Sequence, residues 1–242
     1  ETGQYKVSGL NIVEDQEDGE DVDGDGEAEN KLPGALIIAA LLVDEGLQVD
    51  NLNVTLGEQL AAGDVVLLND LAHAEAVLNV DILLGLLSEE GALSVDPSSY
   101  VSGEPLSRGV GAFSNQTEFS TTSERIELPF PILPEDPDNP DASRLVNIPL
   151  EMVTIEGSVD ANLISGRLYG AIPIDDFING VVERLVPTGD EYDEEVYGMT
   201  REELFELVWS TTNQPGFADI ELPEGGLAVS AVMESSGDAA SW

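Results

Sequence analysis

The chain has 242 residues, of which 42% are hydrophobic, enough to bury the core of one globular domain or of two small ones. Its 49 acidic and 8 basic residues give a formal net charge of −41, which repels nucleic acids and anionic lipid surfaces. Cysteine is absent and no apolar run has the length of a membrane span, so we expect no disulfide, cysteine metal site or transmembrane helix.

Residues 1–3, Glu-Thr-Gly, resemble the scar that a secretion vector leaves after signal cleavage, so we exclude them and take 4–242 as a single domain. An exported protein is therefore expected, either secreted or held in the cell envelope. Apolar residues then alternate with other residues at Tyr5, Val7, Leu10 and Ile12. This alternation predicts a strand over 4–13 that leads into an acidic segment.

The acidic segment, 15–32, gathers carboxylates around three glycines and has Lys31 as its single basic residue. In its core, acids at loop positions 1, 3 and 5 converge if the backbone turns sharply at Gly26, as in a calcium loop. The next residues would add a backbone carbonyl and a carboxylate or water bridge, so that every donor is oxygen. We predict a calcium site made of Asp21, Asp23, Asp25, Glu27 and Glu29.

A helix-loop-helix calcium hand requires a bidentate Glu at position 12, where this chain has Leu32, so that fold is not implied. The run resembles the acidic calcium repeats of thrombospondin type 3 and dockerin modules, which occur in several copies, whereas this chain has one. Only the ligand arrangement is carried over from them. The alternative is a solvated, disordered acidic linker, of which 14–20 is typical.

Two helical segments are expected after the acidic loop. Asn30 and Pro33 open an apolar helix over 34–45, which should be buried because it is apolar on every face. Residues 51–62 combine alternating and helical spacing, and we interpret them as a strand followed by a short helix.

The apolar runs 64–69 and 75–87 predict a hairpin with its turn at 72–74. This turn contains the only histidine, His73. A turn residue is its simplest role, because no nucleophile elbow or other catalytic signature accompanies it.

Two long surface loops are expected, over 88–111, which is rich in Gly, Ser and Pro, and over 134–143. Between them, 119–131 predicts a strand. Its Pro129 and Pro131 place it at a sheet edge, because proline cannot donate to a ladder.

Residues 145–159 and 161–172 predict two strands joined by a turn at Gly157 and Ser158. A helix follows, capped by Asp175 or Asp176 and closed by Pro187.

Thr200 and Glu203 form a capping box for another helix, whose apolar residues we expect to be core. They are Leu204, Phe205, Leu207, Val208 and Trp209. A last strand spans 226–233. This order predicts an α+β to mainly β fold, an antiparallel sheet or sandwich with three or four short helices.

Several segments together resemble uncharacterised secreted proteins and lipoproteins of myxobacteria and related bacteria. They are the Asp23-Gly-Asp25-Gly26 run with Asn30, and residues 61–68, 166–172 and 227–232. The resemblance implies a bacterial, exported protein. It carries over no catalytic residue, because that family has no assigned activity.

Paired carboxylates are the one enzymatic option, since a glycosidase needs two acids about 5–10 Å apart. Aromatic residues are only 5% of the chain, which is lean for a sugar-stacking cleft. The acids at 175–176 and 190–195 could form a second cation site, but a helix cap and a solvated turn explain them better.

We expect a secreted, calcium-stabilised, non-enzymatic binding or structural protein of the cell envelope or extracellular space. Its partner would be a protein or a glycan, bound through 88–111 and 134–143. The alternative is a carboxylate-based, glycosidase-like hydrolase using acids of the same loops. The acidity itself fits adaptation to high salt, the gathering of calcium ligands, or both.

Overall fold

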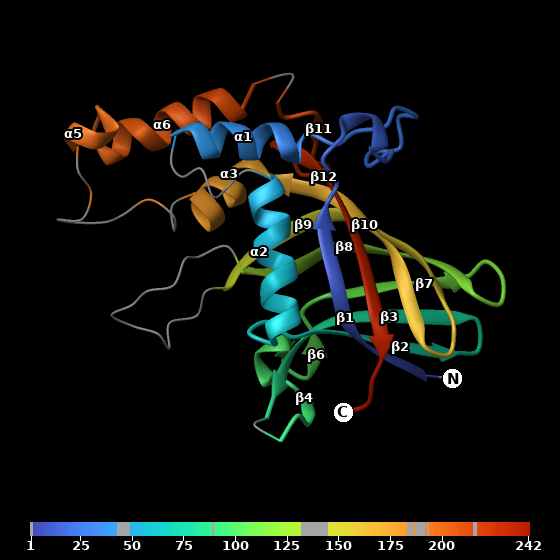
Figure 1. The fold of residues 1–242 in the computed structure, drawn as a ribbon. Coiled ribbons are helices and arrows are strands. Elements are labelled where there is room, and N and C mark those ends of the chain that lie inside the picture. The colour runs from blue at the N-terminus through green and yellow to red at the C-terminus, as the bar shows by residue number, and fades with distance from the viewer. Residues whose placement is uncertain are drawn as a thin grey trace.

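Eight antiparallel strands pair in the order β1-β2-β3-β7-β8-β9-β10-β12, and β12 pairs back with β1, so that the sheet closes into a barrel (Figure 1). The strands are β1 (Thr2–Ile12), β2 (Leu67–Ala74), β3 (Val77–Leu87), β7 (Arg108–Phe113), β8 (Glu118–Pro131), β9 (Leu145–Val159), β10 (Leu163–Pro173) and β12 (Leu227–Ala239). The structure, a computed structural model, describes residues 2–42, 49–88, 90–131, 145–182, 186, 192, 194–214 and 217–242.

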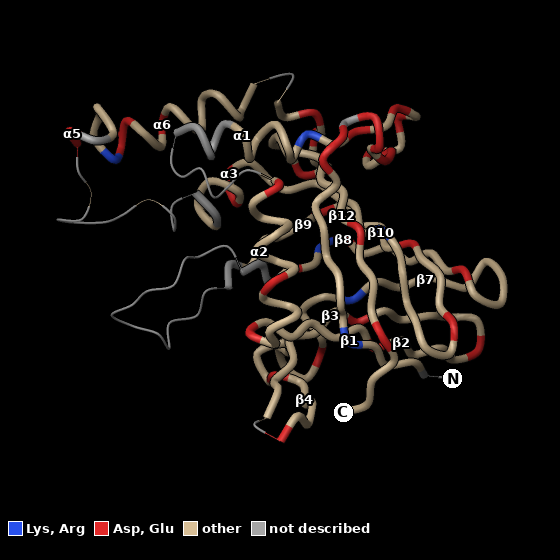
Figure 2. Tube along the Cα trace, in the orientation of Figure 1, with Lys and Arg blue, Asp and Glu red and all other residues tan. Residues whose placement is uncertain are grey.

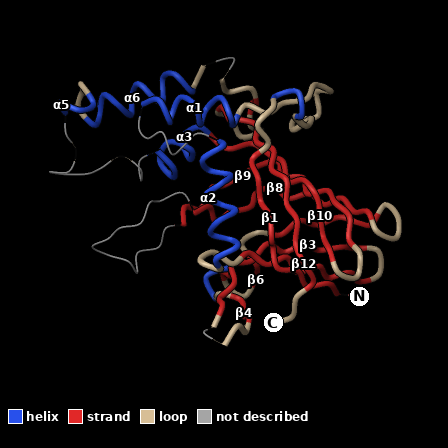
Figure 3. Tube along the Cα trace, in the orientation of Figure 1, coloured by secondary structure: helices blue, strands red, loops and turns tan. Residues whose placement is uncertain are grey.

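Shorter elements fill the connections. The helices are η1 (Gln16–Asp18), α1 (Leu32–Leu42), α2 (Val49–Ala62), η3 (Pro97–Ser99), α3 (Ile174–Phe177), η4 (Ile178–Val182), α5 (Glu194–Tyr197) and α6 (Arg201–Thr212). The short strands are β4 (Leu93–Val95), β5 (Tyr100–Val101), β6 (Glu104–Pro105) and β11 (Ile220–Glu221). Figure 3 shows the helices gathered on one side of the barrel, whereas the hairpin turns at its opposite end carry none.

One apolar core fills the barrel and continues under α2. This helix buries Leu52, Leu56 and Leu60, spaced four residues apart, in the same cluster as the inward residues of the strands. Burying one such leucine contributes about 1.5–3 kcal/mol. Asn53 fixes the helix to the end of β1, because its side chain accepts from the Ile12 N–H (2.8 Å) and donates to the Ile12 carbonyl (3.0 Å).

The mainly β, antiparallel class is confirmed, but the sheet is barrel-like and not a clear sandwich. The strand-then-helix interpretation of 51–62 is wrong, because α2 runs unbroken through it. The four-residue leucine spacing decides this segment, since it gives the helix a continuous buried face. Residues 34–42 are helical as predicted; 43–48 lie outside the described residues.

The two predicted hairpins exist, with turns displaced from their expected positions. The first turn is Glu75-Ala76, with Glu75 at φ +59°, so 72–74 belong to β2 and His73 is a strand residue. The second is at 160–162, where the Asp160 carboxylate accepts from the Asn162 N–H (2.7 Å) and the Leu163 N–H (2.8 Å). The side chain of Asp160 closes the turn, and this local hydrogen bonding decides its position more strongly than Gly157, at which the turn was expected. Gly157 is instead paired with Gly166 inside the strands.

Residues 88–111 are not the single long loop that was expected. They contain β4, η3, β5 and β6 and the start of β7, and Ser99 and Ser107 are buried. The expected loop 134–143 lies outside the described residues. Thr2 and Gly3 pair with Ala72 and Leu71 in the barrel, while the vector origin of residues 1–3 stays a prediction.

The strand over 119–131 exists as β8, but it is an edge only along half of its length. Its whole length pairs with β9, and its first half also pairs with β7 as far as Thr122. Beyond that point, the side of β8 that faces away from β9 has no strand partner among the described residues. Pro129 and Pro131 lie in this half, as the edge rule requires.

The helix after β10 begins at Ile174 with Pro173 at the N-cap, so the predicted cap by Asp175 or Asp176 is wrong. The Thr200–Glu203 capping box is confirmed at the start of α6. Leu204 and Val208 are buried, whereas Leu207 and Trp209, expected to be core, are 37% and 43% exposed. Across the described residues, every helix is too short or too polar to cross a membrane.

Candidate metal centre

The acidic loop is closed at its base by a two-residue bridge. After β1 and η1, Glu20 and Glu29 exchange backbone hydrogen bonds of 3.2 and 2.9 Å, so 21–28 project as a loop. Gly24 and Gly26 adopt φ of +83° and +93°, a conformation that other residues reach at a cost. The sharp turn expected at Gly26 is therefore present.

Each aspartate of the loop is held by nearby backbone N–H groups. The Asp21 carboxylate accepts from Gly24 (2.7 Å) and Gly26 (3.1 Å). Asp23 accepts from the Asp25 N–H (3.1 Å), and Asp25 from the Glu27 N–H (2.8 Å). Asx turns of this kind fix the side chains locally, so the loop orients its carboxylates without help from the rest of the protein.

The loop brings four of the five predicted residues together. Carboxylate oxygens of Asp21, Asp23, Asp25 and Glu29 lie within 4.8 Å of one another, so this group could hold a metal ion. The carboxylate of Glu27 is not part of this group, and its predicted role as a backbone carbonyl ligand stays a prediction. Leu32, at position 12, is buried at the start of α1 and provides no ligand.

Glu29 is the least exposed of the four acids in the cluster. Burial raises the pKa of Glu29, and the charges of Asp23 and Asp25 raise it further, while a 3.0 Å hydrogen bond from the Val22 N–H opposes them. No Lys or Arg is ion-paired with any of the four carboxylates among the described residues. A bound cation would remove this repulsion.

The loop is attached to the barrel at several points. Val22 is buried against Ala171, Ile220, Leu222 and Ala228. Glu20 pairs with Arg167 of β10 at 2.6 Å, and Arg167 also pairs with Glu234 of β12 at 2.9 Å. The candidate centre is thus an exposed loop on a rigid base.

Asn30 connects the loop to the strand before it. Its side chain is 1% exposed and donates to the carbonyls of Val13 (2.9 Å) and Asp15 (3.3 Å). The next residue, Lys31, donates its backbone N–H to Ser230 of β12. Sequence inspection treated Asn30 as a helix-opening residue, whereas it holds together both ends of the acidic segment.

A second acidic grouping lies where β9 bulges in its pairing with β10. Met152, a non-glycine residue at φ +54°, interrupts the regular pairing beside a hollow of about 650 Å³. Arg125, which lines this hollow, pairs with Glu151 (3.1 Å) and Asp176 (3.5 Å). No sequence motif had marked this place, because its three charged residues come from separate elements.

The less favoured alternative of a second cation site at 175–176 and 190–195 gains no support from Asp175, which accepts a 2.8 Å hydrogen bond from the Trp209 indole N–H. Residues 190, 191 and 193 lie outside the described ranges.

Comparison of the chain with protein-family models, curated proteins and solved structures finds no match. The chemistry of the centre therefore follows from its donor atoms alone. These are carboxylate oxygens, and hard divalent cations prefer oxygen donors to sulfur or imidazole ligands.

Proposed function

We propose that this chain is a calcium-stabilised, non-enzymatic binding or structural protein of the extracellular space or the cell envelope. The observation that carries the proposal is the convergence of four carboxylates within 4.8 Å on a loop whose glycines take positive φ. Calcium accepts six to eight oxygen ligands in flexible geometry at about 2.3–2.6 Å, whereas magnesium keeps more of its water and demands a tighter octahedron. An exposed loop with several carboxylates suits calcium better.

Calcium would stabilise the fold through the attachments of the loop. The cation neutralises carboxylates that otherwise repel one another, and the loop is tied to β10, β11 and β12. Extracellular fluids supply calcium at concentrations that such exposed sites can use. In this proposal the chain is exported, as its resemblance to secreted bacterial proteins implies, and its partner would be a protein or a glycan.

The first prediction is that chelation lowers the melting temperature. A ligand that binds only the folded state stabilises it by about 2.7 kcal/mol at a hundredfold excess over its Kd. For a chain of this size that corresponds to a fall of about 5–10 °C on removal of calcium. Thermal unfolding followed by circular dichroism, with calcium, with magnesium and with chelator, measures it.

The matched variants are Asp23→Asn with Asp25→Asn, and Glu202→Gln with Glu206→Gln on the exposed side of α6. Both pairs remove two negative charges, but the first keeps the Oδ1 acceptors and removes calcium ligands. The first pair should lose most of its response to chelation, and the second should respond like the parent. If sodium chloride alone restores stability after chelation and the Asn pair melts like the parent, the acidity serves salt adaptation and the calcium proposal fails.

A carboxylate-based hydrolase is the second candidate, favoured by the hollow that Arg125, Glu151 and Met152 line. Glu151 and the nearby Asp176 are ion-paired with Arg125, while Glu124 and Glu224 also line the hollow. We favour the binding role because the convergence of four carboxylates in the acidic loop is the stronger observation. Hydrolysis of aryl glycosides that disappears in Glu151→Gln would reverse this choice.

A further inference from the structure

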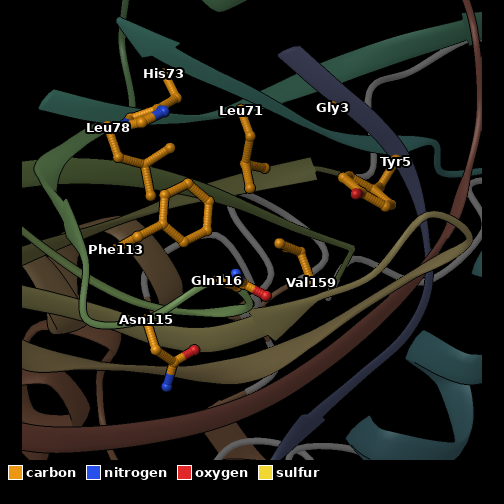
Figure 4. A pocket seen from close by; sticks show the side chains of 9 residues that line it. All are labelled: Gly3, Tyr5, Leu71, His73, Leu78, Phe113, Asn115, Gln116 and Val159. Carbon is orange, nitrogen blue, oxygen red and sulfur yellow. The ribbon is translucent and has the colours of Figure 1, made fainter. Parts of the chain in front are cut away.

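The barrel is closed by α2 at one end and hollowed at the other. A cavity of about 500 Å³ opens among the hairpin ends, lined by residues of β1, β2, β3, β7, β9 and the loop 114–117. In Figure 4, Leu71, Phe113 and Val159 point toward this space from different strands, and Tyr5 faces them from β1. A cavity of this size in the mouth of an eight-stranded barrel suits one small molecule.

The walls of this cavity, which we call the barrel mouth, are mostly apolar and aromatic where the strands form them, while Asn115 and Gln116 add polar groups from the loop 114–117. Tyr5, Leu71 and Leu78 are buried, and His73 packs edge-on against Phe113 with ring centroids 5.3 Å apart. Phe113 in turn packs against Phe119 at 6.1 Å. These ring contacts hold Phe113 in the wall, so this part of the mouth suits an apolar body.

The rim of the barrel mouth is acidic. Glu75 lies in the β2–β3 turn, Asp160 in the β9–β10 turn, and Glu118 accepts a hydrogen bond of 2.5 Å from the Asn115 amide. Figure 2 shows acidic residues around the hairpin turns at this end of the barrel. None of the lining residues is Lys or Arg.

Asp160 is fixed next to the wall. Its carbonyl accepts from the Tyr5 hydroxyl at 2.9 Å, and its carboxylate is held by the two N–H groups of its own turn. These N–H groups lower the pKa of Asp160, which keeps it ionised. Burial and, secondly, the charge of Asp160 raise the pKa of Tyr5, so this charge is felt at the cavity wall.

From this placement we propose that the barrel mouth binds a small organic cation with an apolar body, such as an aryl- or alkylammonium compound. The apolar part fills the space between Leu71, Phe113 and Val159. The ammonium group lies at the rim, attracted by Asp160 and Glu118 and by the neighbouring aromatic rings. An anion of the same size is repelled by the rim and by a net charge of −41.

This inference goes beyond the binding role proposed above and does not depend on calcium. The experiment is isothermal titration of the intact, calcium-loaded protein with three probes of matched size: phenethylammonium, 2-phenylethanol and 3-phenylpropionate. We expect the cation to bind at least tenfold tighter than the anion, with the alcohol between them. We also expect the preference for the cation to fall as sodium chloride is raised, because salt screens the rim charges.

Two variants locate the site. Gln116→Trp places a large side chain at the exposed loop of the mouth and should weaken cation binding at least tenfold. Val110→Trp adds the same group to β7 at a residue that is 48% exposed and does not line the cavity, and should bind like the parent. Equal binding by both variants would place the cation elsewhere and overturn the proposal.

A third variant tests the charge alone. Asp160→Asn combined with Glu118→Gln keeps the hydrogen-bond acceptors and should weaken the cation at least threefold while leaving the alcohol unchanged. Anion binding as tight as cation binding, or no binding of any probe, contradicts the assignment. Either result leaves the calcium response of the loop untouched, so the two proposals fail separately.

Discussion

The two carboxylates Asp70 and Asp81 differ in how their negative charge is compensated. Asp81 is 8% exposed and forms a bidentate pair with Arg108 at 2.6 and 2.8 Å. Asp70 lies directly opposite Asp81 on the neighbouring strand, and no ion pair among the described residues involves it. Burial, and then the charge of Asp81, raise the pKa of Asp70, while Arg108 opposes them.

Asp70→Asn should therefore stabilise the protein at neutral pH. A carboxyl group whose pKa is raised on folding costs stability where it is ionised, and this cost disappears as pH falls through the raised pKa. The gain should stay below about 1 kcal/mol, because the side chain is partly exposed and solvent screens the repulsion. Melting temperatures of Asp70→Asn and the parent should be measured from pH 4 to pH 8. The variant should exceed the parent most at the alkaline end, and the two should converge toward pH 4.

Glu203→Gln is the control for that series, because the pKa of Glu203 is lowered on folding and the expected change in stability has the opposite sign. Hydrogen bonds from the Thr200 N–H and hydroxyl lower the pKa of Glu203, so its charged form contributes stability that is lost as pH falls. Glu203→Gln should melt below the parent at neutral pH, and the gap should close in acid. Parallel curves for both variants would show that pH acts through the net charge and not through these two groups.

At the scale of elements, β8 shows how the barrel protects an incomplete edge. Its second half lacks a partner on the side opposite β9 among the described residues, and Pro129 and Pro131 remove two donors from it. Ser107 also satisfies the backbone of Glu127, two residues before Pro129, by donating to its carbonyl (2.7 Å) and accepting from its N–H (3.1 Å).

We predict that no intermolecular sheet forms through residues 126–128. Replacing both prolines by valine, together with Ser107→Ala, should restore a usable edge and increase self-association at high concentration. Sedimentation velocity over a concentration series measures this, with Pro223→Val, in the turn before β12, as the control. A parent protein already paired through this strand would refute the prediction.

Across the whole molecule, local patterns predicted elements better than they predicted their arrangement. Alternation found β1, and the capping box at Thr200 found α6, because both signals lie within a few residues. The closure of β1 against β12 joins the two ends of the chain, and no local pattern records such a pairing. The barrel mouth depends on that closure, so its lining residues could not be grouped in advance.

The acidic loop could be predicted almost completely, for the same reason. Its four converging carboxylates lie within nine residues, and the turns that orient them are formed by the loop itself. The sequence did not reveal how the loop is attached to the barrel. Val22 packs into the apolar cluster around Ile220 of β11, and Glu20 forms an ion pair with Arg167. These contacts link positions far apart in the chain.

The central claim is that calcium binds in this loop, and a crystal structure of calcium-soaked protein with anomalous scattering from the cation tests it most directly. We predict one anomalous peak bounded by Asp21, Asp23, Asp25 and Glu29, with the Glu27 carbonyl as a further ligand and oxygen distances of about 2.3–2.6 Å. Crystals in which the three aspartates point apart with no cation between them, grown at saturating calcium, would contradict the claim.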